Sequence, residues 1–261
     1  MPTLASLHIH PIKSLGGFAV QEARITDRGF AHDRRWMLVD ANGVFITQRE
    51  VPTMACLHCT PRADGFRVTD VRNGDTIDLP WSLSEGIELA ARVWDDNVLA
   101  LVAPIEHSLW FSHRLGITAV LVYMPDRSKR ATNAAYATGL TSLSDGFPYL
   151  ILSQASLDDL NARMRTPLPM DRFRPNIVIA GGEAFQEDGW KEIVIGTARF
   201  SLVKPCFRCP IPTTDQRTGE RGKEPLRTLA TFRRQGNAVH FGMNAVAVHG
   251  DLVRVGDAVL A

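Results

Sequence analysis

The sequence predicts a mainly β fold with some α-helix, and three observations support this prediction. From Leu4 to about Ala103, short strand-like runs alternate with turn residues. Signals for helices are few and short. The last segment, residues 245–259, again has the pattern of paired strands that close a barrel. At 261 residues, the chain can form one large domain or two modest ones, and either can bury a core.

The first hundred residues are expected to form a small, mainly β barrel or sandwich. Asn42-Gly43 and Asn73-Gly74 stand where tight hairpin turns would join neighbouring strands. The expected strands are short runs rich in apolar and β-branched residues, at 4–10, 35–40 and 44–47.

The remaining residues mix strands with short helices. Ser153 or Ser156 can cap a helix over about 153–161, and Asp158 and Asp159 suit the positive end of its dipole. A second helix is expected over 225–234, where a proline precedes the run and cations end it. The other expected elements are a helix at 106–115 and strands at 119–123, 176–180, 193–195, 198–203, 245–248 and 252–259.

Composition is that of an ordinary globular protein, with 45% hydrophobic residues and a net charge of +1. This charge provides no general attraction to nucleic acid or to a membrane, so any anion site must be local. We find no secretory signal and no apolar run of about 18 residues that could span a bilayer. We therefore expect a cytoplasmic location, in which four cysteines are free, metal-bound or catalytic rather than disulfide-bonded.

The segment Lys204-Pro205-Cys206-Phe207-Arg208-Cys209-Pro210 is the most informative part of the chain. Its prolines disfavour a helix interior or a central strand, so it should form a rigid loop that presents Arg208 and Cys209. A buried, inert thiol and a redox CxxC pair are the alternatives, but the redox motif normally opens a helix. The adjacent guanidinium favours a thiolate, which is a ligand for a soft metal.

A four-thiolate zinc site is a rival interpretation, because Cys56 and Cys59 form a second CxxC pair. Residues 60–205 separate the two pairs, whereas compact zinc ribbons use spacings of about 15 to 20 residues. In a strand, residues three apart point to opposite faces. A core-packing role for Cys56 and Cys59 is therefore preferred.

Three further segments carry candidate anion-binding groups. Residues 11–17 place Lys13 and Ser14 in a glycine-containing loop, which can hold a phosphate or be a simple surface turn. In the segment Asp33-Arg34-Arg35-Trp36, one arginine can pair with Asp33 while the other is free for an anion. A surface salt bridge is the simpler interpretation of such a pair. Arg172 and Arg174 precede a buried strand with Asn176, at a strand mouth where sites gather.

A pair of carboxylates follows in the segment Glu187-Asp188-Gly189-Trp190. These side chains could form a catalytic acid pair or orient the two arginines, and we favour the orienting role.

Taken together and in this order, these segments resemble the MOSC family, named for the C-terminal domain of molybdenum cofactor sulfurases. Within it, they are most similar to the branch of the mitochondrial amidoxime-reducing component and its bacterial relatives. The matching pieces are HPIKSLGG, DRRWMLVD, TQRE, LSQASLDDLN, RFRPNIVIAGG, EDGW, KPCFRCPIPTTDQRTGE, EPLRTL, FGMN and VRVGD. The resemblance implies an N-terminal MOSC β-barrel domain at 1–98, packed against a MOSC domain at 99–261 with a pyruvate-kinase-like β-barrel core.

The resemblance also implies a molybdopterin cofactor bound at the junction, with Cys209 as the protein ligand to molybdenum and Arg208 beside it as a catalytic residue. A position where the mitochondrial proteins have threonine and serine is here Gly146-Phe147, which would offer backbone contacts only. The cofactor carries a phosphate and a dithiolene, which are bound well by bidentate donors such as guanidinium groups. A protein whose net charge is near zero can supply such donors locally. The implied cofactor-binding residues are Lys13, Ser14, Arg34, Gly146, Phe147, Arg174, Asn176 and Arg208.

The activity implied is the reduction of small N-hydroxylated or related N-oxygenated compounds. We expect no [2Fe-2S] domain and no pyridoxal-phosphate domain in this chain, so electrons should come from a separate donor protein. The alternatives are a non-redox carrier of molybdenum cofactor or sulfur on Cys209, and a structural protein with zinc-bound or buried cysteines. In the preferred interpretation, Cys206 is a packing or supporting residue.

Overall fold

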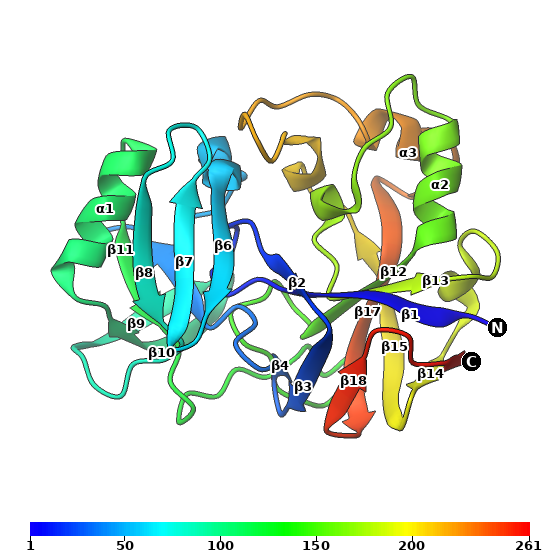
Figure 1. The fold of residues 1–261 in the computed structure, drawn as a ribbon, viewed down its shortest axis with the longest axis horizontal. Helices are drawn as coiled ribbons and strands as arrows, with labels where there is room; N and C mark the ends of the chain where they lie inside the picture. The colour runs from blue at the N-terminus through cyan, green and yellow to red at the C-terminus, as the bar shows by residue number, and fades with distance from the viewer.

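The C-terminal half of the protein is built around a closed β-barrel, as a computed structural model of residues 1–261 shows (Figure 1). The sheet begins and ends with strands from opposite ends of the chain. Thr3 bridges Ala258, Leu4 N donates to Asp257 O over 2.8 Å and Val259 N donates to Pro2 O over 2.9 Å, which closes the sheet. In order, its strands are β1 (Thr3–Ile9), β13 (Ile177–Ala180), β12 (Tyr149–Ser153), β17 (Ala238–His249), β15 (Ala198–Phe207), β14 (Glu192–Ile195) and β19 (Val259–Leu260), with β2 (Phe18–Val20) beside β1 and β16 (Arg234–Gln235) beside β17.

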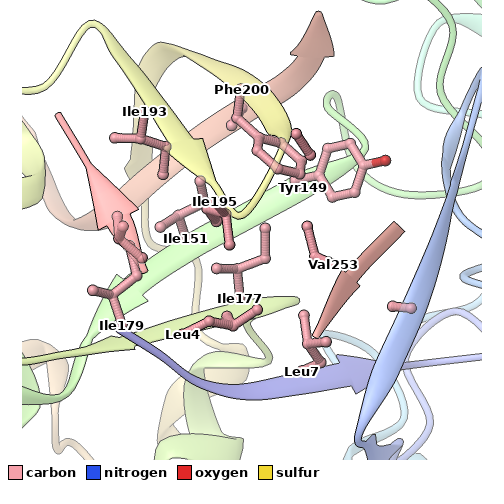
Figure 2. Packing of buried hydrophobic residues seen from close by; sticks show 14 of the residues in the cluster. Leu4, Leu7, Tyr149, Ile151, Ile177, Ile179, Ile193, Ile195, Phe200 and Val253 are labelled. Carbon is pink, nitrogen blue, oxygen red and sulfur yellow. The ribbon is translucent and has the colours of Figure 1, made fainter. Parts of the chain in front are cut away.

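Alternate residues of these strands fill the barrel interior. The aromatic rings of Tyr149 and Phe200 meet edge to face, 5.2 Å apart, among isoleucines and leucines from the surrounding strands (Figure 2). Residues two apart on a strand share a face, so each strand contributes an inward-facing set. The labelled members of this core are Leu4, Leu7, Tyr149, Ile151, Ile177, Ile179, Ile193, Ile195, Phe200 and Val253.

The N-terminal half contains two further sheets, which pack around a second core and lie beside the barrel (Figure 1). Trp36, Phe66 and Phe111 are among its fully buried side chains. One sheet has the order β5 (Trp36–Val39), β11 (Val120–Tyr123), β10 (Asp96–Val102) and β9 (Glu88–Val93), and the other has β6 (Leu57–Arg62), β7 (Gly65–Asp70) and β8 (Thr76–Pro80). A small sheet of β4 (Gly29–Phe30), β3 (Glu22–Thr26) and β18 (Leu252–Arg254) joins both ends of the chain.

The three expected helices are present. Ser153 caps one of them by accepting from Ser156 N over 3.1 Å, as the sequence allowed. The helices are α1 (Ile105–Leu115), α2 (Gln154–Ala162) and α3 (Leu226–Phe232), and the 3-10 turns are η1 (Pro52–Cys56), η2 (Met170–Phe173), η3 (Gln186–Gly189) and η4 (Ile211–Thr213). The mainly β fold with some α-helix is thus confirmed.

Some strand predictions were wrong. Residues 44–47 do not form a strand. After the Asn42-Gly43 turn, Val44 and Phe45 each make a single isolated bridge, and each to a different strand. The strands near the end do not pair with one another: β18 pairs with β3, and β19 pairs with β14. The expected strand at 198–203 continues to Phe207, since irregular pairing with β17 accommodates Pro205.

The division of the chain at residues 98 and 99 stays a prediction, but the structure adds two facts about it. That point lies within β10, and the four-stranded sheet continues into β11. β1 belongs to the C-terminal barrel through its pairing with β13. No helix of the structure combines the length and the apolar character needed to cross a membrane.

Candidate functional site

An open pocket lies where loops from both halves meet. The loop after β1, the loop after β4, the segment before β12, the start of β13 and the end of β15 all contribute to its wall. All nine site residues predicted from the sequence line this pocket, namely Lys13, Ser14, Arg34, Gly146, Phe147, Arg174, Asn176, Arg208 and Cys209. Their convergence is a finding, and their individual roles stay predictions.

Three of these residues have left-handed backbone conformations. The φ angles of Ser14, Arg34 and Arg174 are 68°, 48° and 56°. A residue with a side chain loses about 1–2 kcal/mol in this conformation. Such strain persists only where the surroundings hold it, and it concentrates at functional sites. The pocket therefore has its loops fixed in conformations that stability alone would not favour.

Arg34 is fixed by a buried network. Its Nη1 donates to the Asp33 carboxylate over 2.5 Å and to Asn176 Oδ1 over 2.8 Å, and its Nη2 donates to Arg174 O over 3.2 Å. Because Asp33 is only 1% exposed, this pair is not the surface salt bridge considered from the sequence. The neighbouring Arg35 instead pairs with an exposed carboxylate outside the pocket.

Positive charge is crowded in this region. Burial lowers the pKa of Lys13 to about 8, although the Asp145 carboxylate 2.6 Å away opposes the shift. Burial, and then Arg34, lower the pKa of Arg174 to about 10. Burial together with Arg174 and Arg34 holds the pKa of His10 well below its usual range. The pocket is therefore electrostatically prepared for an anion.

Asp145 and Arg49 are site residues that the sequence reasoning missed. Asp145 accepts from Lys13 and, over 2.8 Å, from Arg49 Nη2. The cations Lys13 and Arg49 hold the pKa of the Asp145 carboxyl well below its usual range. A signal was present, because Asp145 directly precedes Gly146 and Arg49 lies in the TQRE segment that matches the family pattern.

Cys209 lines the pocket as a half-buried thiol, just after the end of β15. The neighbouring Arg208 is held by two acceptors, Cys206 Sγ at 3.1 Å and Phe173 O at 2.9 Å. Its Nε is buried without a partner. The CxxC pair begins within the end of β15 and is succeeded only by the short η4 turn, so it lacks the helix of a redox motif. Because its Sγ accepts a hydrogen bond from Arg208 Nη1, Cys206 supports the orientation of Arg208.

The other two cysteines lie in the N-terminal half. Cys56 and Cys59 are both buried, and Cys59 belongs to the apolar core. Burial raises the pKa of the Cys59 thiol to about 12, which keeps it protonated. No three His, Cys, Asp or Glu side chains are grouped so that they could hold a metal ion. The structure thus gives no support to a four-thiolate zinc site.

The carboxylates of residues 187–188 do not orient the predicted arginines, so that interpretation was wrong. Glu187 is fully buried and accepts from Ser156 Oγ over 2.7 Å. Asp188 pairs with Arg233, which lies outside the pocket. Arg172 is instead held by Asp215, 2.7 Å away, so the acidic segment has a structural role.

Comparison with known proteins agrees with this geometry. Residues 1–118 match the family model described as the MOSC N-terminal beta barrel domain, and residues 139–260 match the MOSC domain. Mitochondrial amidoxime-reducing component 1 of Mus musculus is 31% identical over 276 residues, which cover 98% of this chain and 81% of that protein. The chain belongs to the MOSC family.

Two further MOSC relatives show how much of each protein is shared. Mitochondrial amidoxime reducing component 2 of Rattus norvegicus is 33% identical over 246 residues, covering 88% of this chain and 72% of that protein. Molybdenum cofactor sulfurase of Drosophila persimilis is 30% identical over 258 residues, covering 93% of this chain. The chain spans only 32% of that sulfurase.

MOSC membership implies a molybdenum cofactor, and the residues present fit one. Lys13, Arg34, Arg174 and Arg208 line the pocket together with a single carboxylate, Asp145. A phosphate-bearing, sulfur-liganded metal group needs such an excess of donors and a soft protein ligand. The buried, unpartnered Nε of Arg208 and the half-buried Cys209 thiol supply these needs at one end of the pocket.

Proposed function

We propose that this MOSC protein is a molybdenum cofactor-binding oxidoreductase that reduces N-hydroxylated or related N-oxygenated compounds with electrons from a separate donor protein. The observation that carries the proposal is the convergence of Cys209 with four cationic side chains in one pocket. The family and its amidoxime-reducing relatives support the same function. A cytoplasmic location and the absence of iron–sulfur and pyridoxal-phosphate domains stay predictions.

Each part of the pocket has a distinct task in this proposal. The Cys209 thiolate would ligate molybdenum, and Arg208 would lie beside that ligand with its guanidinium held by Phe173 O. Lys13 and Arg174 would bind the anionic part of the cofactor. The remaining contacts to the pterin and its phosphate would come from Ser14, Arg34, Gly146, Phe147 and Asn176.

When bound, the cofactor would supply two-electron reduction chemistry. Overall, reduction of an N-hydroxylated substrate would consume two electrons from the donor protein and two protons from solvent, and the oxygen would leave as water. The polypeptide need not provide a side-chain acid for bond cleavage. Its contribution is to hold the cofactor in a fixed orientation through donors whose geometry is already set.

The proposal is tested by producing the protein in a host that makes molybdopterin. Molybdenum is measured by mass spectrometry, pterin by fluorescence, and amidoxime reduction with a chemical electron donor. We expect Cys209→Ser to lose both metal and activity, and Cys59→Ala, at a buried thiol of the N-terminal core, to keep both. Full metal and activity in Cys209→Ser would overturn the proposal.

A second function is a non-redox carrier of molybdenum cofactor or sulfur. The observation in its favour is that Cys209 is only half-buried in an open pocket, where it can accept a sulfur atom. A stable persulfide on Cys209 in the purified protein, without turnover by any reductant, would support the carrier over the reductase.

A further inference from the structure

The TQRE segment matches the family pattern, yet the proposed function gives it no task. In the structure it follows the isolated bridge Val39↔Phe45 and leads into η1. Gln48 is fully buried and its Nε2 donates to Ser14 O over 2.6 Å. Arg49 follows directly and reaches Asp145. The segment therefore touches two residues that line the pocket.

The Arg49 guanidinium contacts Asp145, a carboxylate that lines the pocket. Its Nη2 donates to Asp145 over 2.8 Å, while its Nη1 is buried and has no hydrogen-bond partner. Burial opposes the charged form of Arg49, yet the Asp145 carboxylate helps to raise its pKa. The guanidinium also stacks on the Trp94 ring, 4.7 Å from the ring centre, which limits where it can move.

A hairpin that follows Cys209 holds the same segment from the other side. Thr214 bridges Arg221, and Asp215 N donates to Glu220 O over 2.7 Å. The Arg221 guanidinium donates to Arg49 O over 3.2 Å and also to Gln48 O. We call residues 214–221 the clasp hairpin. In Figure 1 the chain between β15 and α3 arches from the barrel toward the N-terminal half.

The clasp hairpin is packed closely on the N-terminal half. The His58 ring nitrogen Nε2 is 2.8 Å from Gln216 O, and Cys56 Sγ donates to Arg217 O over 3.5 Å. Gly219 has a φ of 73°, and a Cβ placed there would lie 3.2 Å from Thr53 Cα. These contacts leave the hairpin little freedom to move.

We infer that Arg49 is a further cofactor-binding residue on the Asp145 side of the pocket, and that Arg221 positions it from the clasp hairpin. The inference rests on the proposed function. The unpartnered Nη1 of Arg49 provides a charge-assisted donor for the anionic cofactor. Because Arg49 comes from the N-terminal half and Cys209 from the C-terminal half, retention of the cofactor depends on the docking of the clasp hairpin.

The first experiment measures how long the loaded protein keeps its cofactor. Molybdenum and pterin per chain are followed after dilution and gel filtration. We expect Arg49→Gln to lose cofactor about tenfold faster than wild type or more, since a hydrogen bond to a charged group is lost. Arg49→Lys keeps the charge and should be intermediate. Arg35→Gln is the matched control, because Arg35 also stacks on an aromatic ring and pairs with a carboxylate, but outside the pocket.

The second experiment uses cofactor-free protein and tests the positioning role of Arg221. Hydrogen exchange of residues 47–50 and 214–222 should become about tenfold faster in Arg221→Gln, as two charge-assisted hydrogen bonds are removed. Arg221→Lys should restore part of the protection and of the cofactor retention. Arg217→Gln changes an exposed side chain of the same hairpin and should leave both unchanged.

The outcomes separate the inference from the proposed function. Wild-type protein without molybdenum or pterin would overturn the proposed function and with it the role of Arg49. Loaded wild type with normal retention in Arg49→Gln would overturn the inference alone. Unchanged exchange and retention in Arg221→Gln would remove Arg221 from its positioning role.

Discussion

Arg34 Nη1 donates to Asn176 Oδ1 over 2.8 Å, although the two residues are 142 positions apart in the chain. Asn176 Nδ2 in turn donates to His8 O over 3.2 Å, so this amide joins the N-terminal segment to the start of β13. Arg34 would otherwise be a buried cation held by Asp33 alone among the side chains. The amide therefore has a structural task besides its predicted contact with the cofactor.

Replacement of this amide should destabilise the protein. We expect Asn176→Ala to lower the free energy of unfolding by about 1–3 kcal/mol, because buried donors and an acceptor lose their partners. Chemical denaturation of the cofactor-free protein measures the change. Asn97→Ala, at an exposed residue near the start of β10, is the control and should change stability by about 0.5 kcal/mol or less. Equal stabilities of the two variants would contradict the prediction.

A pair of glycine variants separates steric conflict from backbone strain. Gly242 in β17 has a φ of 82°, and a Cβ there would lie 2.8 Å from Ile151 O and the Leu152 side chain. Gly236 has a φ of 57° and open space around it. We expect Gly236→Ala to cost about 1–2 kcal/mol through the left-handed conformation alone, and Gly242→Ala to cost about 1–3 kcal/mol more through the clash. Thermal and denaturant unfolding of both variants provide the comparison, and similar losses would contradict it.

The buried Lys13 should make stability depend on pH. Its pKa is about 8 in the folded protein and 10.5 for an unperturbed lysine, so between these values the unfolded chain binds more protons. Stability due to this group therefore rises as pH increases from about 8 to about 10.5. Relative to Lys13→Met, wild type should gain on the order of 2 kcal/mol over this range.

Denaturant unfolding of both proteins at a series of pH values isolates this contribution, because other titrating groups cancel in the difference. A difference that does not vary above pH 8 would show that Lys13 keeps its charge. Lys129→Met, an exposed lysine, serves as the control and should show no such rise.

Local patterns were sufficient to predict most of the elements. The strand at β1, the helix over α1 and the Ser153 cap depend on residues close in the sequence, and the structure confirms them. The pairing of β18 with β3 could not be predicted, because it is decided by contacts between opposite ends of the chain. The same holds for the closing bridge from Thr3 to Ala258.

The residues of the candidate site were likewise predicted only in part. Motif segments placed Lys13, Arg174 and Cys209 in one expected site, and the structure brings them together. Arg49 was missed because its partner Asp145 lies 96 positions away, and a single arginine in a polar segment has no distinctive local signal. Glu187 was misinterpreted because proximity in sequence to two arginines does not determine which side chains meet in space.

The pairing of β1 with residues near the other end of the barrel also sets an order of events during synthesis. Thr3 leaves the ribosome early, but its partner Ala258 is made only after the other strands of the barrel except β19. During synthesis the barrel therefore cannot close until residue 258 has emerged, and until then the N-terminal strand lacks this closing contact.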